Sequence, residues 1–243
     1  MSAGQQKSIE SVDLGRISYE QAYARKVDAL EAVLRGRESG QPIAGTVFLL
    51  EHDPPVITVS KRRGAGKHLL ATGEMLDRAG VEVVETDRGG DITYHGPGQL
   101  VVYAILDLNA LGLNLHAYMR LLEQVAIDTC ARFGIATGRD ASATGVWTNA
   151  NSGDTGDGGI DGGGKICALG VRVRRWVSMH GLALNVDPDM GHFDLIVPCG
   201  LHGRRVTSMA QELGEGVPSM QEVKGVMGEV FEARIGELRG VRQ

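Results

Sequence analysis

Short runs of β-branched and aromatic residues stand next to one another along this chain, and they constrain its fold more than any other feature. Residues 45–52 (GTVFLLEH) and 55–60 (PVITVS) are two such runs, separated by Asp53 and Pro54, and the second run begins with another proline. This pattern predicts paired strands joined by a proline turn. Further strand-like runs lie at positions 81–87, 92–95, 99–108, 145–148, 165–176 and 177–186. Because strands outnumber helices and come in adjacent groups, the sequence predicts an α+β fold with a mixed or antiparallel sheet.

Three amphipathic helices accompany these strands. The first begins at a capping box at Ser18 and runs to about residue 36, with apolar residues at helical spacing. The second covers 114–134, where an asparagine begins the helix and a glycine ends it. The third begins at another capping box, at Ser219. A shorter helix is predicted at 74–79.

Glycine is unusually common, at 35 of 243 residues, or about twice its average share. Residues 149–164 (NANSGDTGDGGIDGGG) hold seven of these glycines and a single large apolar side chain, Ile160. Such a segment cannot bury enough surface to order itself. Strand-like sequence resumes at once at residue 165, so we interpret the segment as a flexible insertion within a single domain that covers residues 1–243.

The composition favours a cytoplasmic globular protein. Hydrophobic residues make up 42% of the chain and charged residues 23%, which is typical of a domain with a real core. The longest apolar run, 100–106, is far shorter than the roughly 20 residues that span a bilayer, and the polar start is unlike a signal peptide. A net charge of −5 argues against a general nucleic-acid binder.

The three cysteines are too few for a disulfide scaffold, and their spacing is not that of a zinc site. Cys199 lies between Pro198 and Gly200 in a predicted loop, and it is the best candidate for a nucleophile because a loop cysteine is not needed for packing. Cys130 lies in the second amphipathic helix and is interpreted as a small hydrophobic residue. Cys167 lies in an apolar strand, where burial makes a thiol unreactive.

Glycine, histidine and unusual polar residues gather in three segments, at positions 88–99, 165–186 and 198–200. Taken singly, the first two have structural explanations. A glycine-rich turn between strands is common, and a lysine at a strand start, such as Lys165, is usually solvated. For His95 and His180, a hydrogen-bonded structural role and a pocket-lining role are equally open.

Together the three segments resemble the lipoyl(octanoyl) transferases, which move an octanoyl group from acyl carrier protein to a protein lysine. The patterns of that family appear in order as RGGDITYHGPGQ, KICALGVRV, HGLALNV and PCGL, at positions 88–99, 165–173, 180–186 and 198–201. The similarity covers about residues 15–235 and is interrupted by the insertion; residues 60–66 also depart from the family pattern. The resemblance implies the fold of biotin and lipoate protein ligase catalytic domains, a mixed, largely antiparallel sheet with helices on its outer face.

The resemblance also implies the roles of individual residues. Cys199 would carry the acyl group as a thioester, and Lys165 would be its catalytic partner. No metal, ATP or other cofactor is expected, because exchange between thioesters is nearly isoenergetic and amide formation from a thioester is downhill. The acyl-binding wall would consist of Arg88, Gly89, Gly90, Asp91, Ile92, Thr93, Tyr94, His95, Ala168, Leu169, Gly170, Gly181, Leu182 and Ala183.

The partners that the resemblance implies are octanoyl-acyl carrier protein as donor, and lipoyl domains of 2-oxoacid dehydrogenase complexes and the glycine cleavage H protein as acceptors. These proteins are acidic, as is this chain, so docking needs a local basic surface. We expect such a surface from the arginines that follow the Lys165 strand and the Cys199 loop, although a solvated strand face explains the first group equally simply. They are Arg172, Arg174, Arg175, Arg204 and Arg205.

Three other functions remain open from the residues alone. An ATP-dependent lipoate or biotin ligase of the same fold would use the basic stretch 61–67, although this stretch lacks the residues of a P-loop at Lys61 and His68. A thiol hydrolase would pair Cys199 with His180 or His202. A non-catalytic module would bind only the acyl chain or its carrier.

Overall fold

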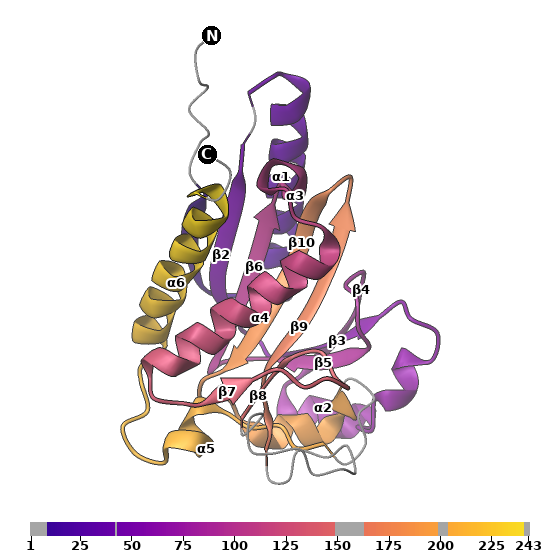
Figure 1. Ribbon diagram of the computed structural model, residues 1–243. Coiled ribbons are helices and arrows are strands. Elements are labelled where there is room, and N and C mark those ends of the chain that lie inside the picture. Colours follow the sequence, from indigo (N-terminus) through magenta and orange to yellow (C-terminus); the bar gives the residue numbers. More distant parts are fainter. Residues whose placement is uncertain (1–8, 42, 149–162, 199–203, 241–243) are drawn as a thin grey trace.

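The computed structural model describes residues 9–41, 43–148, 163–198 and 204–240. Strands and helices alternate irregularly along the chain (Figure 1). In chain order the elements are β1 (Glu10–Ile17), α1 (Tyr19–Glu38), β2 (Gly45–His52), β3 (Val56–Ser60), η1 (Ala65–His68), α2 (Gly73–Ala79), β4 (Glu82–Thr86), β5 (Ile92–His95), β6 (Gln99–Leu106), α3 (Leu108–Leu111), α4 (Leu115–Arg132), β7 (Thr137–Gly138), β8 (Val146–Thr148), β9 (Lys165–Arg174), β10 (Val177–Asn185), η2 (Met190–Leu195), α5 (Met209–Leu213) and α6 (Met220–Gly240).

The larger sheet has seven strands in the order β1-β2-β6-β10-β9-β8-β7. Only β1 and β2 run parallel, and all other neighbours are antiparallel. The prediction of a mixed, largely antiparallel sheet is therefore confirmed. Every residue of β6 is buried, because this central strand is covered on both faces.

A second sheet of three strands has the order β4-β3-β5, and it corrects one prediction. Residues 45–52 and 55–60 do form strands, but β2 belongs to the larger sheet and β3 to the smaller one, so they are not a hairpin. Both edges of β2 are already paired, with β1 and β6. Pro54 and Pro55 have no backbone N–H to extend a ladder, and the chain crosses to the second sheet there.

Helices cover both faces of the larger sheet. The helices α4 and α6 pack on one face, where Tyr118, Leu122 and Phe231 share a core with β6 and β10. The helix α1 packs on the other face through Leu30 and Leu34, as Figure 1 shows. The three-stranded sheet has its own small core around Ile57, Tyr94 and Phe193.

The predicted helix starts are confirmed by their capping hydrogen bonds. The Ser18 and Asn114 side chains accept from the backbone N–H groups three residues later, over 3.2 and 2.8 Å. At Ser219 the box is reciprocal, because its backbone N–H also donates to the Glu222 carboxylate over 2.8 Å. Among the described helices, none is long and apolar enough to cross a membrane.

One strand was not predicted from the sequence, and one predicted segment lies largely outside the described residues. The strand β1 was not predicted, because Glu10–Ile17 is a mostly half-exposed edge strand without a clear apolar alternation. Most of the predicted insertion, 149–162, lies outside the described residues. Its ends are joined, since Thr148 N–H donates to the carbonyl oxygen of Gly164 over 2.9 Å. The larger sheet is thus continuous on both sides of the insertion.

Candidate active site

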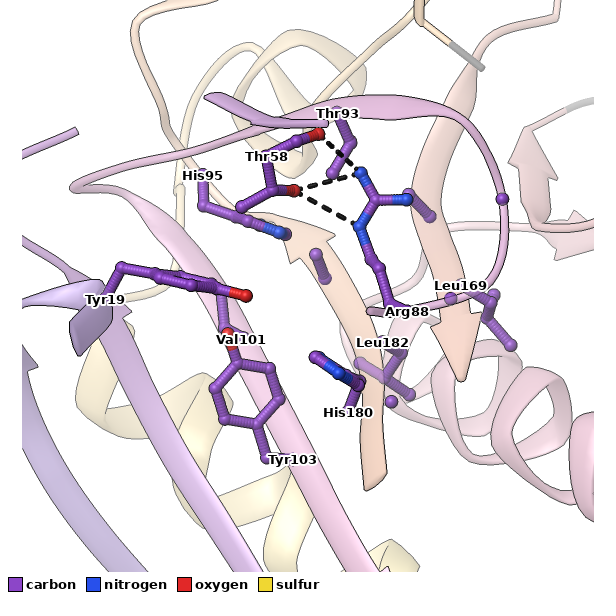
Figure 2. Close-up of a pocket in the computed structure, with 15 residues that line it drawn as sticks. Tyr19, Thr58, Arg88, Thr93, His95, Val101, Tyr103, Leu169, His180 and Leu182 are labelled. Atoms are coloured by element: carbon purple, nitrogen blue, oxygen red, sulfur yellow. Dashed lines mark hydrogen bonds between the residues drawn. The ribbon is translucent and has the colours of Figure 1, made fainter. Parts of the chain in front are cut away.

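A pocket lies between the two sheets, beside the beginning of α1. The strands β6, β9 and β10 supply one side of it, and the three-stranded sheet with the loop before β5 supplies the other. Figure 2 shows the lining side chains pointing toward a common space. We call this space the central pocket, and its walls are Tyr19, Thr58, Arg88, Gly90, Thr93, His95, Val101, Tyr103, Ala168, Leu169, Gly170, His180, Gly181, Leu182 and Ala183.

Most residues of the predicted acyl-binding wall line the central pocket, but Gly89, Asp91, Ile92 and Tyr94 do not. The alternation of a strand explains part of this split. In β5, Thr93 and His95 face the pocket, whereas Ile92 and Tyr94 face the core of the smaller sheet. Asp91 instead binds the His68 imidazole, over 2.8 Å.

The glycines of two motifs allow a close crossing of backbones over the pocket. A Cβ on Gly170 would lie 2.9 Å from the carbonyl oxygen of Gly89 and 3.1 Å from the Arg88 side chain. The Gly89 N–H donates to the carbonyl of Val171 over 2.9 Å. Arg88 then reaches Thr58, donating to its carbonyl over 2.7 Å and to its hydroxyl over 2.9 Å, as Figure 2 shows. The paired glycines therefore let the 88–90 loop pass close to β9 and cover the pocket there.

A chain of buried amides connects the pocket to the segment beside Lys165. His95 Nδ1–H donates to the Gln99 amide oxygen over 2.7 Å, and Gln99 donates to Asn185 over 2.9 Å. Asn185 in turn donates to the Thr207 carbonyl over 2.8 Å. Three separate sequence motifs are thus held together by one hydrogen-bonded path, which orients the pocket relative to the lysine.

Lys165 begins β9 and is buried, with 6% of its surface exposed. Its Nζ lies over the Trp147 ring, 4.8 Å from the centroid, an arrangement that stabilises a cation. Gly145 makes room for the side chain, since a Cβ there would lie 3.1 Å from the lysine Cε. From the sequence alone, Lys165 was expected to be exposed to solvent, whereas the structure buries it.

The predicted nucleophile, Cys199, lies outside the described residues, as do Gly200 and His202. Both flanks of this segment are described. Val197 N–H donates to the His68 carbonyl over 2.8 Å, and the Arg205 carbonyl accepts from Lys165 N–H over 2.9 Å. The returning flank thus pairs directly with the backbone of Lys165.

The other two cysteines are buried, as expected from their positions. Burial raises the pKa of the Cys130 thiol to about 12 and raises the pKa of Cys167 well above its usual value. Neither thiol is ionised at neutral pH, and ionisation is what makes a cysteine nucleophilic.

His180 is not available as a base for Cys199. Its Nε2–H donates to the Asp87 carboxylate over 2.8 Å, and its Nδ1 lies 3.1 Å from the Lys26 ammonium nitrogen. Burial lowers the pKa of His180 to about 4, despite the opposing hydrogen bond to Asp87. Both ring nitrogens are occupied, so the pairing of Cys199 with His180 in a thiol hydrolase is not supported.

The arginines of the predicted docking surface all form ion pairs within the chain. Arg172, Arg174 and Arg175 pair with carboxylates of Asp87, Glu31 and Glu38. Arg205 pairs with Glu212 over 3.8 Å and stays half exposed. Arg204 pairs with Asp140 and lies over the Trp147 ring, 4.1 Å from the centroid. Arg204 is therefore part of the Lys165 surroundings rather than a free surface charge.

Sequence reasoning missed four lining residues, namely Tyr19, Thr58, Val101 and Tyr103. They come from elements that carry no glycine or histidine motif, so only the fold places them at the pocket. One signal was available nearby, since Lys26 lies on the buried face of α1 together with Ala22 and Leu30. In the described ranges, no three His, Cys, Asp or Glu side chains are grouped so as to hold a metal ion.

Comparison with known proteins agrees with this geometry. Residues 23–232 match the lipoyl protein ligase A/B catalytic domain family. An octanoyltransferase of Bacteroides fragilis is 42% identical over 218 residues, which cover 90% of this chain and 94% of that protein.

Solved structures show the same fold at low identity. A bipartite lipoate protein ligase from Thermoplasma acidophilum superposes with a TM-score of 0.67 at 14% identity, covering 95% of this chain and 85% of that one. A biotin protein ligase from Aquifex aeolicus gives a TM-score of 0.52 at 12% identity, covering 94% and 71%. By sequence over most of its length, the chain belongs to the lipoyl protein ligase A/B catalytic domain family and, within it, to the octanoyltransferases.

Proposed function

We propose that this octanoyltransferase works in two steps, with acyl carrier protein as donor, a thioester on Cys199 as intermediate and a lysine of a lipoyl domain as acceptor. The observation that carries the proposal is the position of the central pocket. It follows β9 and β10 away from Lys165, whose backbone pairs with the flank of the Cys199 segment. An acyl chain bound there would present its thioester carbon to this pair of residues.

In the first step the Cys199 thiolate attacks the carbonyl carbon of the donor thioester. The bond to the phosphopantetheine sulfur breaks, and that sulfur leaves as a thiolate that takes up the proton of the Lys165 ammonium. The buried Lys165 ammonium favours the anionic form of a neighbouring thiol. Trp147 holds the ammonium in place through its ring.

In the second step the acceptor amine attacks the Cys199 thioester. The carbon–sulfur bond breaks, an amide forms and the amine loses a proton. Once Lys165 has passed its proton to the departing sulfur, its neutral amine can take the proton of the attacking nitrogen. The cysteine leaves as a thiolate, which restores the starting charge pair.

Partner proteins are proposed on the same basis. The Thermoplasma acidophilum ligase of similar fold is described together with its E2 lipoyl domain, which supports a lipoyl domain as acceptor. We extend this to the lipoyl domains of 2-oxoacid dehydrogenase complexes and to the glycine cleavage H protein. Docking would involve Arg205, whose side chain is the more exposed of the two arginines after Cys199.

The test is intact-protein mass spectrometry after incubation with octanoyl-acyl carrier protein in the absence of ATP. The wild type should gain one octanoyl group on Cys199 and pass it to an added lipoyl domain. Cys199→Ala should gain none, whereas Cys130→Ala should still be acylated, because its buried thiol serves only packing.

Other outcomes would separate the alternative functions. Octanoyl adenylate formed from free octanoate and ATP, without acylation of Cys199, would identify a ligase. Tight binding of octanoyl-acyl carrier protein without any covalent product would identify a binding module. Full transfer by Cys199→Ala would refute the thioester intermediate.

A further inference from the structure

Lys26 is a buried lysine that the proposed reaction does not use. It lies on α1 and is completely buried. Among the described residues, no carboxylate forms an ion pair with it. Its Nζ lies 3.1 Å from His180 Nδ1, and 3.9 and 5.1 Å from the ring centroids of Tyr103 and Tyr19. Burying a charged or polar group costs free energy unless hydrogen bonds or opposite charges offset it. The contacts around Lys26 therefore call for an explanation.

Four side chains surround the Lys26 amine, those of Tyr19, Tyr23, Tyr103 and His180, and all but Tyr23 are also walls of the central pocket. Tyr19, Tyr103 and His180 all line it, and Figure 2 shows them grouped on one side of the space, with Leu169 on the other. We call these three residues the end wall. Lys26 lies directly behind the end wall and contacts each member of it.

The strand register places Tyr103 and His180, the two members of the end wall that lie in strands, at the far end of the pocket from Lys165. Ala168 pairs with Ala183, and Gly170 pairs with Gly181, which in turn pairs with Tyr103. Five residues of β9 separate Lys165 from Gly170, or about 17 Å at ~3.4 Å per residue. An extended eight-carbon chain is roughly 10 Å long, and the lysine side chain accounts for much of the rest. An octanoyl chain that starts beside Lys165 therefore ends at the end wall.

The hydrogen bonds of the end wall make it rigid and polar. Because His180 donates through Nε2 to the Asp87 carboxylate, its Nδ1 carries the lone pair and accepts from Lys26. Tyr23 also donates to Asp87, over 3.0 Å. A longer acyl chain would have to break these bonds and place methyl groups against the polar amine of Lys26. Leaving buried polar groups without partners costs more than a further buried methylene contributes.

From these contacts we infer that Lys26 is a specificity-determining residue, which holds His180 and supports Tyr19 and Tyr103 so that the pocket ends at about the eighth carbon of the acyl chain. The inference rests on the proposed octanoyl transfer. It adds the residue that sets the length of the accepted chain.

The experiment compares Lys26→Met with Lys224→Met as matched control. Lys224 is also a buried lysine, but it lies on α6 and pairs with Asp13, away from the pocket. For each protein, kcat/KM of Cys199 acylation is measured with hexanoyl, octanoyl, decanoyl and dodecanoyl carrier protein. In the wild type we expect a sharp fall beyond eight carbons.

Methionine keeps the length of the lysine but removes its charge and its hydrogen bond to His180. Lys26→Met should therefore raise the ratio of decanoyl to octanoyl acylation, by up to about fifteen-fold if both extra methylenes become buried. Lys224→Met should keep the wild-type ratio. An unchanged ratio in Lys26→Met would overturn the inference.

The wild type alone also tests the inference if Lys26→Met does not fold. Equal rates with octanoyl and dodecanoyl donors would show that no end wall limits the chain, and would overturn it. A wild type that acylates Cys199 with none of the donors would instead refute the proposed function, and the inference would fall with it.

Discussion

Two buried lysines lie at opposite ends of the central pocket, and their surroundings differ. Lys165 is at the end where the Cys199 segment returns, and its ammonium lies over Trp147. Lys26 is at the other end, completely buried, with His180 and tyrosine rings around it. The two lysines are therefore buried in different settings, one beside the proposed nucleophile segment and one beside a network of histidine and tyrosine side chains.

The two ends also differ in how they treat charge. The Lys165 end contains a second cation over the same ring, Arg204, which Asp140 neutralises. The Lys26 end is connected through His180 to Asp87, so its counter-charge lies one residue further away. The first arrangement keeps positive charge where a thiolate is proposed to form. The arrangement around Lys26 holds the polar end wall in place, and the lysine itself lies behind that wall.

The largest expected effect is at the Lys165 end. Lys165→Ala should lower octanoyl transfer by about 10³-fold, within the range for loss of a proton-transferring group, and should move iodoacetamide alkylation of Cys199 to higher pH. Lys165→Arg should keep the alkylation profile but lose the amine step, because arginine does not deprotonate. Superimposable alkylation profiles for wild type and Lys165→Ala would place this lysine outside the reaction.

A second prediction concerns stability at the far end. Burial lowers the pKa of Lys26 to about 7, whereas lysine in an unfolded chain titrates near ~10.4. Between these values the unfolded chain holds a proton that the folded one has lost, so the free energy of unfolding of the wild type rises with pH. Lys26→Met has no titratable group at this position, so its free energy of unfolding lacks this rise with pH.

The free energy of unfolding of Lys26→Met minus that of the wild type should therefore fall between about pH 7 and pH 10. The fall should be a few kcal/mol, as the size of the pKa shift implies. Urea denaturation at several pH values measures it. Parallel curves for the two proteins would mean that Lys26 keeps its proton throughout, and the two buried lysines would then differ less than the structure suggests.

A smaller effect is expected at Arg204 and Arg205. Removing Arg204 leaves the Asp140 carboxylate, whose side chain is 7% exposed, without its ion-pair partner, although Ser142 still donates to it. It also removes the guanidinium that lies over Trp147. Arg204→Gln should therefore lower kcat about tenfold with octanoyl-acyl carrier protein and with a small octanoyl thioester alike, the cost of about one buried charge-assisted hydrogen bond. Arg205→Gln should raise only the KM for the carrier protein. The reverse result would make Arg204 the docking residue.

The smallest effect is expected from the glycine-rich insertion. Replacing residues 151–163 by a short turn should change the unfolding free energy by less than about 1 kcal/mol, because closure entropy depends only logarithmically on loop length. The ends at Thr148 and Gly164 are already joined by hydrogen bonds. Calorimetry and the acylation assay measure the two consequences. Loss of acylation with an unchanged melting temperature would show that the insertion acts at the Lys165 end.

Local sequence patterns determined most of the secondary structure. The capping boxes at Ser18 and Ser219 predicted helix starts because their hydrogen bonds involve residues three apart. Runs of β-branched residues predicted β2, β6, β9 and β10 for a similar local reason. The pairing of β2 with β3 was wrong, since pairing depends on which strands occupy the edges of the sheet, and β1 had no local signal.

The site divides in the same way. Sequence alone placed Lys165, His180 and the glycine motifs, because a family resemblance identifies residues one at a time. Only the tertiary structure showed that His180 binds Lys26, which lies 154 positions away along the chain, and that Arg204 lies on Trp147. A sequence pattern specifies what a residue can do. The residues that surround it after folding decide which of those properties it uses, because charge, hydrogen bonding and burial depend on neighbours in space.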